Sequence, residues 1–320
     1  MTAMQAPFDT PIDDSADLLV GPLRGPRQML ATQQYDNHTS IHDDATAQKL
    51  GFKGGTIEGP THFSQFVPLC VALWGTRWLE SGCLSAHYRN PCFEGERVRA
   101  FVARPKNGET QTTIWMQRED GVEILRGTAA VGSDNPPSAL EQRIKDLAPP
   151  DRLVILHDVS VGMRGQRMRI RMDANQHMGH LYPFSLADKL KVITENSPWY
   201  SAAGAGSSPW GRAIIPVEMI SVLLNHSRDA NEFPVRGPVV GLFADQEIRL
   251  IGGPLFVGED YEIEREVVAL SGSRRTESMW IRTRVMKPGS DEVIATMLLN
   301  SASLKDSYAN YARDLAALES

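Results

Sequence analysis

The sequence has no run of about 20 apolar residues, the length that an α-helix needs to cross a bilayer. Residues 1–17 contain neither a basic segment nor an apolar core, so they do not resemble a secretory signal peptide. Lysine and arginine never gather into a long run, and the formal net charge is −6. A nucleic-acid-binding protein usually carries a basic patch. We therefore expect neither a membrane-spanning segment nor a nucleic-acid partner.

Cysteine is also scarce, and the three residues are Cys70, Cys83 and Cys92. Their number and spacing fit neither a disulfide framework nor a zinc site. Free thiols in a chain without a targeting segment favour a cytoplasmic location. The glycine pair 54–55 lacks the lysine and the spacing of a P-loop, and no dinucleotide-binding glycine motif follows a predicted strand.

What is present fits a globular protein of two domains. The chain has 320 residues, of which 42% are hydrophobic and 22% are charged. Domains commonly contain about 100–150 residues. Glycine, proline and polar residues are concentrated in the middle of the chain. We therefore place a linker at 136–150, between an N-terminal domain at 1–135 and a C-terminal domain at 151–320.

A short pattern recurs in the two halves. Pro-x-Phe-x-Gly-Glu starts at Pro91 and again at Pro254, 163 residues later. An apolar, aromatic segment follows each copy, with Trp115 and Trp280 at similar places. Four fixed positions can recur by chance, but the matching surroundings favour an internal duplication.

A segment with the spacing of a buried helix precedes each copy of the pattern. The first covers residues 60–75 and the second covers 216–225. Pro60 suits the first turn of a helix, where its missing N–H would have no partner. Pro68 lies in the middle of the first segment and predicts a kink.

Alternating apolar and polar residues after each helix predict antiparallel strands. The predicted strands cover 84–89, 97–104, 110–119 and 123–131 in the first half, and 246–251, 261–267, 276–286 and 292–304 in the second. One long helix wrapped by an antiparallel sheet is a hotdog fold. We predict an α+β protein with two hotdog domains in tandem, whose sheets join and so remove two exposed edges.

The first half also contains an ordered series of motifs. Residues 36–44 form a polar loop with two histidines, a short helical segment follows, and a glycine-rich turn at 53–59 leads to Pro60. This order resembles the MaoC-like (R)-specific enoyl-CoA hydratases, which carry an Asp-x-Asn-Pro-x-His loop, a short helix and a His-Gly turn. The resemblance continues through residues 88–96 and extends more loosely over the second half.

The acid of the family's loop has two candidates in this chain. Counted back from His42, the position falls on Asn37, whereas counted back from the helix it falls on Asp36. We take Asp36 as the acid, with Asn37 as the alternative. Either residue could instead form a turn or cap the following helix.

The chain departs from the family's pattern elsewhere too. The family's Asn-Pro is replaced by residues 39–40, and its His-Gly is Glu58-Gly59. The second half repeats the loop with Glu195 as the acid and Tyr200 in place of the histidine. Tyrosine does not titrate near neutrality as histidine does, so we expect the first half to be the catalytic one.

The resemblance implies a hydro-lyase that acts on the double bond or the 3-hydroxyl of an acyl-CoA or acyl-carrier thioester, without a metal or redox cofactor. Asp36 and His42 would share the catalytic water. The backbone N–H at Gly59 would stabilise the thioester oxygen. The resemblance also allows a homo-oligomer of double-hotdog units.

Two other hypotheses stay open. Glu58 at the start of the buried helix resembles the acid of hotdog thioesterases, which would make the protein an acyl-CoA thioesterase. The altered motifs would also fit a catalytically degenerate subunit that binds acyl thioesters. Glu195 and Tyr200 are secondary catalytic candidates that could equally serve packing and hydrogen bonding.

Overall fold

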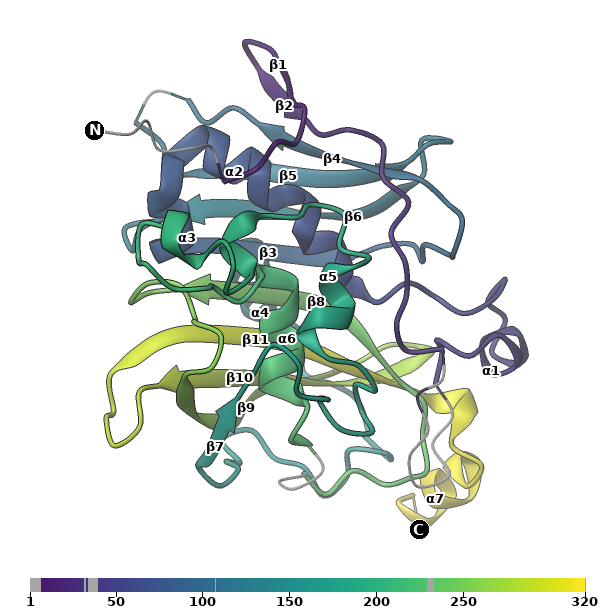
Figure 1. Cartoon of the computed structure of the whole chain (residues 1–320). Coiled ribbons are helices and arrows are strands. Elements are labelled where there is room, and N and C mark those ends of the chain that lie inside the picture. The colour runs from purple at the N-terminus through teal and green to yellow at the C-terminus, as the bar shows by residue number, and fades with distance from the viewer. Residues whose placement is uncertain (1–6, 32, 34–39, 107, 229–232, 320) are drawn as a thin grey trace.

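The computed structural model describes residues 7–31, 33, 40–106, 108–228 and 233–319. Its centre is a single antiparallel sheet of 11 strands (Figure 1). The strands of the first half are β1 (Asp13–Asp14), β2 (Leu18–Val20), β3 (Gly82–Tyr88), β4 (Val98–Ala103), β5 (Gln111–Arg118) and β6 (Glu123–Val131). Those of the second half are β7 (Met168–Arg171), β8 (Gly241–Leu250), β9 (Asp260–Gly272), β10 (Thr276–Met286) and β11 (Val293–Leu304).

The two halves of the sheet meet where β3 pairs with β8. Outward from this junction the order is β3, β6, β5, β4, β2, β1 on one side and β8, β11, β10, β9, β7 on the other. Trp115 and Trp280 lie on β5 and β10, which hold equivalent places in this order. Two hotdog units therefore share one continuous sheet, which confirms the predicted fold.

The central helices cover one face of the sheet (Figure 1). They are η1 (Gly59–Phe66) and α2 (Val67–Trp74) in the first half and α6 (Val217–Asn225) in the second. η1 and α6 contact each other across the junction, and both are buried. The remaining helical segments are α1 (Asp44–Lys49), η2 (Gly75–Arg77), α3 (Trp78–Ser81), α4 (Ala139–Lys145), α5 (Leu186–Leu190), η3 (Pro198–Tyr200), η4 (Ala205–Ser207), η6 (Lys305–Ser307) and α7 (Tyr311–Ala317). Among the described residues, no helix is both long enough and apolar enough to span a membrane.

The first central helix is not continuous. Its first eight residues form the 3₁₀ helix η1, and the α-helix α2 begins only at Val67. Pro68 has no N–H to donate to the carbonyl of the preceding turn. The change of helix type therefore occurs where the proline predicts a kink.

The predicted strands agree with the observed ones to within a few residues. The bounds of β6 match the prediction, although its burial does not alternate strictly and several consecutive residues are buried. In β4 every second residue is buried, as expected of a strand with one face on the core. β1, β2 and β7 were not predicted, because strands of 2, 3 and 4 residues are too short to show a period.

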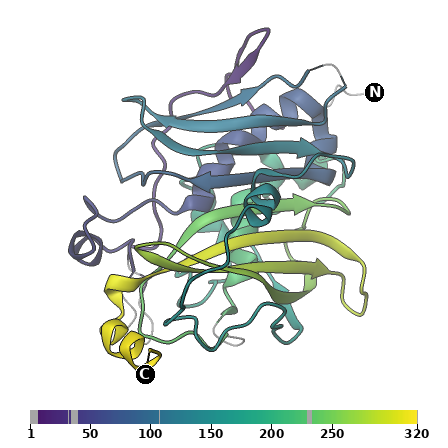
Figure 2. The same cartoon turned by 180° about the vertical axis from the view of Figure 1, so that it is seen from behind.

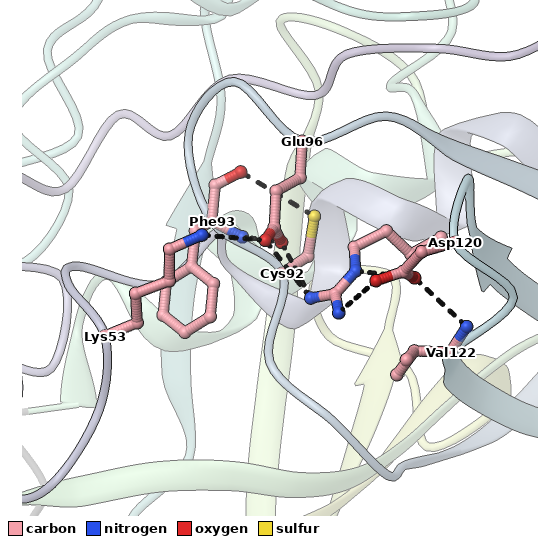
Figure 3. Close-up of polar contacts among 7 residues, drawn as sticks. Lys53, Cys92, Phe93, Glu96, Asp120 and Val122 are labelled. Carbon is pink, nitrogen blue, oxygen red and sulfur yellow. Dashed lines mark hydrogen bonds and ion pairs between the residues drawn. The ribbon is translucent and has the colours of Figure 1, made fainter.

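The repeated Pro-x-Phe-x-Gly-Glu pattern forms the same turn in both halves. In each copy the N–H of the glutamate donates to the carbonyl of the phenylalanine. Gly95 and Gly258 have φ angles of 85° and 77°, in the left-handed region that favours glycine. In the first copy the Glu96 carboxylate accepts from the N–H of Phe93 and lies 3.4 Å from Lys53 Nζ (Figure 3).

These turns hold the chain where it enters each central helix. Phe93 pairs with Thr56, and Phe256 pairs with Ile214, through isolated β-bridges. The same backbone contact therefore fixes the start of η1 in one half and of α6 in the other. The pattern recurs because both helices need this support.

The segment predicted to be a linker, 136–150, contains the helix α4 on the opposite face of the sheet (Figure 2). α4 begins with a capping box at Ser138 and contacts β3, β6 and β8. Leu140 is fully buried against Trp280. The segment thus covers the junction from outside, and we keep 136–150 as our proposal for the boundary between the domains.

Gly127 of β6 lies unusually close to the backbone of β3. A Cβ at this position would lie 1.8 Å from the carbonyl oxygen of Ser85. Because backbone in a paired sheet cannot move aside, we expect Gly127→Ala to lower the free energy of unfolding by about 1–3 kcal/mol. Urea unfolding followed by circular dichroism measures this change.

Gly25→Ala is the matched control, because a Cβ there would meet no atom within 4 Å. Equal unfolding free energies of the two variants would contradict the close approach of β6 and β3.

Candidate functional site

A cavity of about 660 Å³ is lined by residues of both halves. Its wall includes the start of η1, the length of α6, and the strands β8 to β11. Most of this wall is apolar, with side chains such as Leu30, Ile57, Val222, Met297 and Leu299. Such a cavity suits a ligand with a long apolar part and a few polar groups.

His42 lines this cavity and is oriented by the glycine-rich turn. Its Nδ1 lies 2.7 Å from the carbonyl oxygen of Thr56. A carbonyl can only accept a hydrogen bond, so Nδ1 carries a proton, and Nε2 is the ring nitrogen that can accept one. Gly55 permits this approach, since a Cβ there would lie 2.3 Å from the carbonyl oxygen of His42.

The loop that carries His42 continues into α1. The N-cap of α1 is Asp43, whose side chain accepts from the N–H of Thr46 at 2.8 Å. This bond holds the pKa of Asp43 below its usual value. The cap of this helix is therefore neither Asp36 nor Asn37. Both of those candidates for the catalytic acid lie outside the described residues.

Gly59 is the first residue of η1 and lies against the ring of Tyr88. A Cβ on Gly59 would lie 2.6 Å from Cζ of that ring, so only glycine fits. As the first residue of a helix, Gly59 has an N–H without a partner inside the helix. Tyr88 donates to Gln246 at 2.9 Å, and Gln246 donates to Ser221 at 2.8 Å. The start of η1 is thus connected to the second half.

Glu58 lines the cavity beside Gly59. One carboxylate oxygen accepts from the N–H of Met29 at 2.6 Å, and the other accepts from the hydroxyl of Thr61 at 3.4 Å. The structure therefore brings three of the predicted site residues, His42, Glu58 and Gly59, onto one wall of one cavity.

A buried ion pair that the sequence did not predict completes this wall. Nζ of Lys189 lies 3.1 Å from the Glu218 carboxylate, and both side chains are at most 5% exposed. Lys189 also donates to Thr61 at 2.9 Å. Burial raises the pKa of Glu218, and the neighbouring ammonium opposes this rise. The one available clue was a single charge within the apolar segment 216–225.

His62 lies on the same wall and is 2% exposed. Its Nδ1 has no hydrogen-bond partner, and burial lowers its pKa to about 3, with a further contribution from Lys189. His62 follows Pro60 by two residues, as Glu218 follows Pro216. The two halves therefore present different polar groups at equivalent positions of their central helices.

Glu195 and Tyr200 belong to the second copy of the loop. Glu195 is 2% exposed and forms two hydrogen bonds with the Arg24 guanidinium, at 2.7 and 3.1 Å, and one with Thr10. Tyr200 packs edge-on against Phe8, with ring centroids 6.1 Å apart. Neither of these two described residues lines the cavity. The N-terminal segment thus covers the second copy of the loop and binds its acid.

The described residues contain no group of three or more His, Cys, Asp or Glu side chains arranged to hold a metal ion. The three cysteines are free and buried. Burial raises the pKa of each thiol, at Cys70, Cys83 and Cys92. Thiols of this kind are poor nucleophiles, because the thiolate is the reactive form.

The buried His62 makes the stability of the fold depend on pH. Its pKa is about 3 in the folded protein, against about 6.5 in an unfolded chain. Protonation of His62 therefore favours unfolding. The contribution of neutral His62 to the free energy of unfolding is fully present above pH 6.5 and is lost as the pH falls toward 3. Between pH 5.5 and 4, we expect His62→Leu to reduce the slope of unfolding free energy against pH by about 1.4 kcal/mol per unit.

The measurement is urea unfolding at a series of pH values. The exposed His177 offers a matched control, and we expect His177→Leu to leave the slope unchanged. Parallel curves for wild type and His62→Leu would show that His62 is not held neutral in the folded state.

Solved structures provide the comparison for this fold. A protein from Chloroflexus aurantiacus J-10-fl named a MaoC domain protein dehydratase has a TM-score of 0.54 and 12% sequence identity, over 95% of this chain and 99% of its own. A Mycobacterium tuberculosis protein with a double hotdog fold has a TM-score of 0.46 and 12% identity, over 92% and 96%. An acyl-CoA thioesterase II, TesB2, from Mycobacterium marinum has a TM-score of 0.39 and 12% identity, over 78% and 90%.

The sequence itself matches no protein-family model and has no significant match among curated proteins. The likeness to the Chloroflexus protein covers nearly all of both chains, and at this level of identity it shows the fold. The solved structures similar to this chain include MaoC-like dehydratases and a protein with a double hotdog fold.

Proposed function

We propose that this protein is a hydro-lyase that adds water to, or removes it from, the acyl group of an acyl-CoA or acyl-carrier thioester. The observation that carries this proposal is the arrangement of His42 on the cavity wall. Its Nδ1 is bound by the Thr56 carbonyl at 2.7 Å, beside the helix start at Gly59. The fold it shares with the Chloroflexus protein, named a dehydratase, adds support.

The cavity suits the acyl part of such a substrate. Ligand sites commonly measure about 300–1,000 Å³, and this one measures about 660 Å³. Its apolar wall would bind the hydrocarbon chain, while the polar residues at the start of η1 would face the thioester. This division matches a molecule with one reactive polar group and an apolar chain.

His42 would act as the base of the reaction. In hydration, the oxygen of water bonds to C3 of a 2-enoyl thioester and C2 gains a proton. With its proton on Nδ1, the imidazole can take a proton from water at Nε2. General acid–base catalysis of this kind contributes about 10²- to 10⁴-fold in rate. We infer that Asp36, which lies outside the described residues, shares the same water. The proton that Nε2 takes from this water then passes to C2, so that one water adds across C2–C3 and the imidazole returns to its starting form.

Gly59 would stabilise the charge that develops on the thioester oxygen. Its N–H stands at the start of a helix, where backbone donors are unpaired and the helix dipole favours negative charge. A hydrogen-bond donor aimed at such an oxygen is worth about 10²- to 10³-fold in kcat. Tyr88 keeps the position free of any side chain, since a Cβ on Gly59 would lie 2.6 Å from its ring.

We propose a cytoplasmic location for this reaction. The three cysteines are free thiols, which are typical of reducing compartments.

The first test is His42→Ala. We expect it to lower kcat with crotonyl-CoA at least 100-fold, because the base is lost. Hydration is followed by the loss of enoyl-thioester absorbance. His177→Ala is the matched control, since His177 is exposed and outside the cavity. Near-wild-type turnover of a folded His42→Ala variant would refute the proposed role.

A thioesterase is the second candidate function, because Glu58 presents a carboxylate on the same wall. Both of its oxygens already accept hydrogen bonds, from Met29 and Thr61. We therefore expect Glu58→Gln to leave hydration within about tenfold of wild type. Release of free CoA thiol by the wild type, abolished in Glu58→Gln, would instead favour the thioesterase. If neither reaction occurs but acyl-CoA binds, the protein is an acyl-thioester-binding subunit.

A further inference from the structure

The cavity contains a buried arginine at the end away from η1. Arg265 lies on β9, lines the cavity and is 3% exposed. One of its terminal nitrogens donates to the carbonyl of Leu224 at 2.5 Å and lies 3.3 Å from the Ser227 hydroxyl. Its Nε and its other terminal nitrogen have no hydrogen-bond partner. Two nitrogens of the guanidinium group therefore have N–H donors without a hydrogen-bond acceptor.

The surroundings of Arg265 are basic. No carboxylate among the described residues forms an ion pair with it. Burial, and next the charge of Arg228, lower the pKa of Arg265 to about 10. Arg228 and Arg236 line the same cavity, and Arg236 is itself 3.1 Å from Asp158. Arg228 is thus close enough to Arg265 to repel its charge, in an otherwise largely apolar cavity.

A buried guanidinium without a carboxylate partner is costly, because desolvation of the charge is not offset. An arginine pairs best with a planar anion that can accept two parallel hydrogen bonds. We propose that Arg265 binds a carboxylate at the far end of the acyl group, so that the substrate is a dicarboxylic acyl thioester. This inference rests on the proposed acyl-thioester function and names its substrate class.

The position of Arg265 fits that role. It binds the carbonyl of Leu224, near the end of α6, whereas Glu218 near the start of α6 is joined through Lys189 to Thr61. Six residues of α-helix span about 9 Å. Apolar side chains of α6 and β11 line the cavity between these ends. An acyl chain of several carbons could therefore place its thioester near Gly59 and its carboxylate near Arg265.

Binding of three compounds tests this site. They are adipyl-CoA, hexanoyl-CoA and CoA, of which the first two have the same chain length and differ in the terminal carboxylate. Isothermal titration calorimetry measures each Kd. For the wild type we expect adipyl-CoA to bind about 10- to 100-fold more tightly than hexanoyl-CoA, as expected of a charged hydrogen bond. We expect Arg265→Met to remove this preference and to leave hexanoyl-CoA binding unchanged.

Arg284→Met is the matched control. Arg284 follows Thr283, the β10 partner of Arg265, so its side chain points to the other face of the sheet. We expect it to keep the preference. If Arg265→Met does not fold, Arg265→Lys replaces it. Lysine keeps the charge but lacks the planar fork, and we expect a preference intermediate between those of wild type and an uncharged variant.

Two results would overturn the site. One is equal affinity of the wild type for adipyl-CoA and hexanoyl-CoA. The other is an Arg265 variant that raises the Kd of all three compounds by the same factor, because Arg265 would then bind a CoA phosphate. Turnover of 2-hexenedioyl-CoA and 2-hexenoyl-CoA tests the lyase separately. If adipyl-CoA binds tightly but neither 2-hexenedioyl-CoA nor 2-hexenoyl-CoA is hydrated, the proposed lyase activity is wrong. The proposed carboxylate site at Arg265 would still stand.

Discussion

The pairing of β3 with β8 determines how the two halves of the protein are arranged. It joins the two hotdog units edge to edge, with Leu84 opposite Ile248 and Ala86 opposite Gln246. This pairing brings η1 and α6 into contact on one face of the sheet. The cavity is lined by both helices and by strands of the second half, so neither half could form it alone.

The two halves share this sheet but differ in where their copies of the loop lie. In the first, the loop with His42 reaches the cavity wall, and the polar groups of η1 are held by partners from the second half, such as Lys189. In the second, the equivalent acid, Glu195, is bound by Arg24 of the N-terminal segment. One copy of the loop therefore reaches the cavity and the other is covered by the N-terminal segment, while the second half contributes a wall of the cavity through α6.

Sequence patterns predicted the structural features that depend on residues close together in the chain. Alternating apolar and polar residues predicted the long strands. The repeated turn indicated the duplication, because its glycines, Gly95 and Gly258, need positive φ angles. The family resemblance led to His42 and Gly59. It could not lead to Lys189 or Arg265, because Lys189 and its partner Thr61 are 128 residues apart and Arg265 is buried only by tertiary packing. Contacts between residues far apart in the chain leave no periodic pattern in the sequence around them.

We propose that the thioester binds at the start of η1 with its acyl chain in the cavity. The most direct measurement is a crystal structure of the protein with a saturated acyl-CoA bound. We expect the thioester oxygen about 3 Å from the backbone nitrogen of Gly59, with the chain running along α6. An acyl chain found outside the cavity, beside Glu195 and Tyr200, would contradict it.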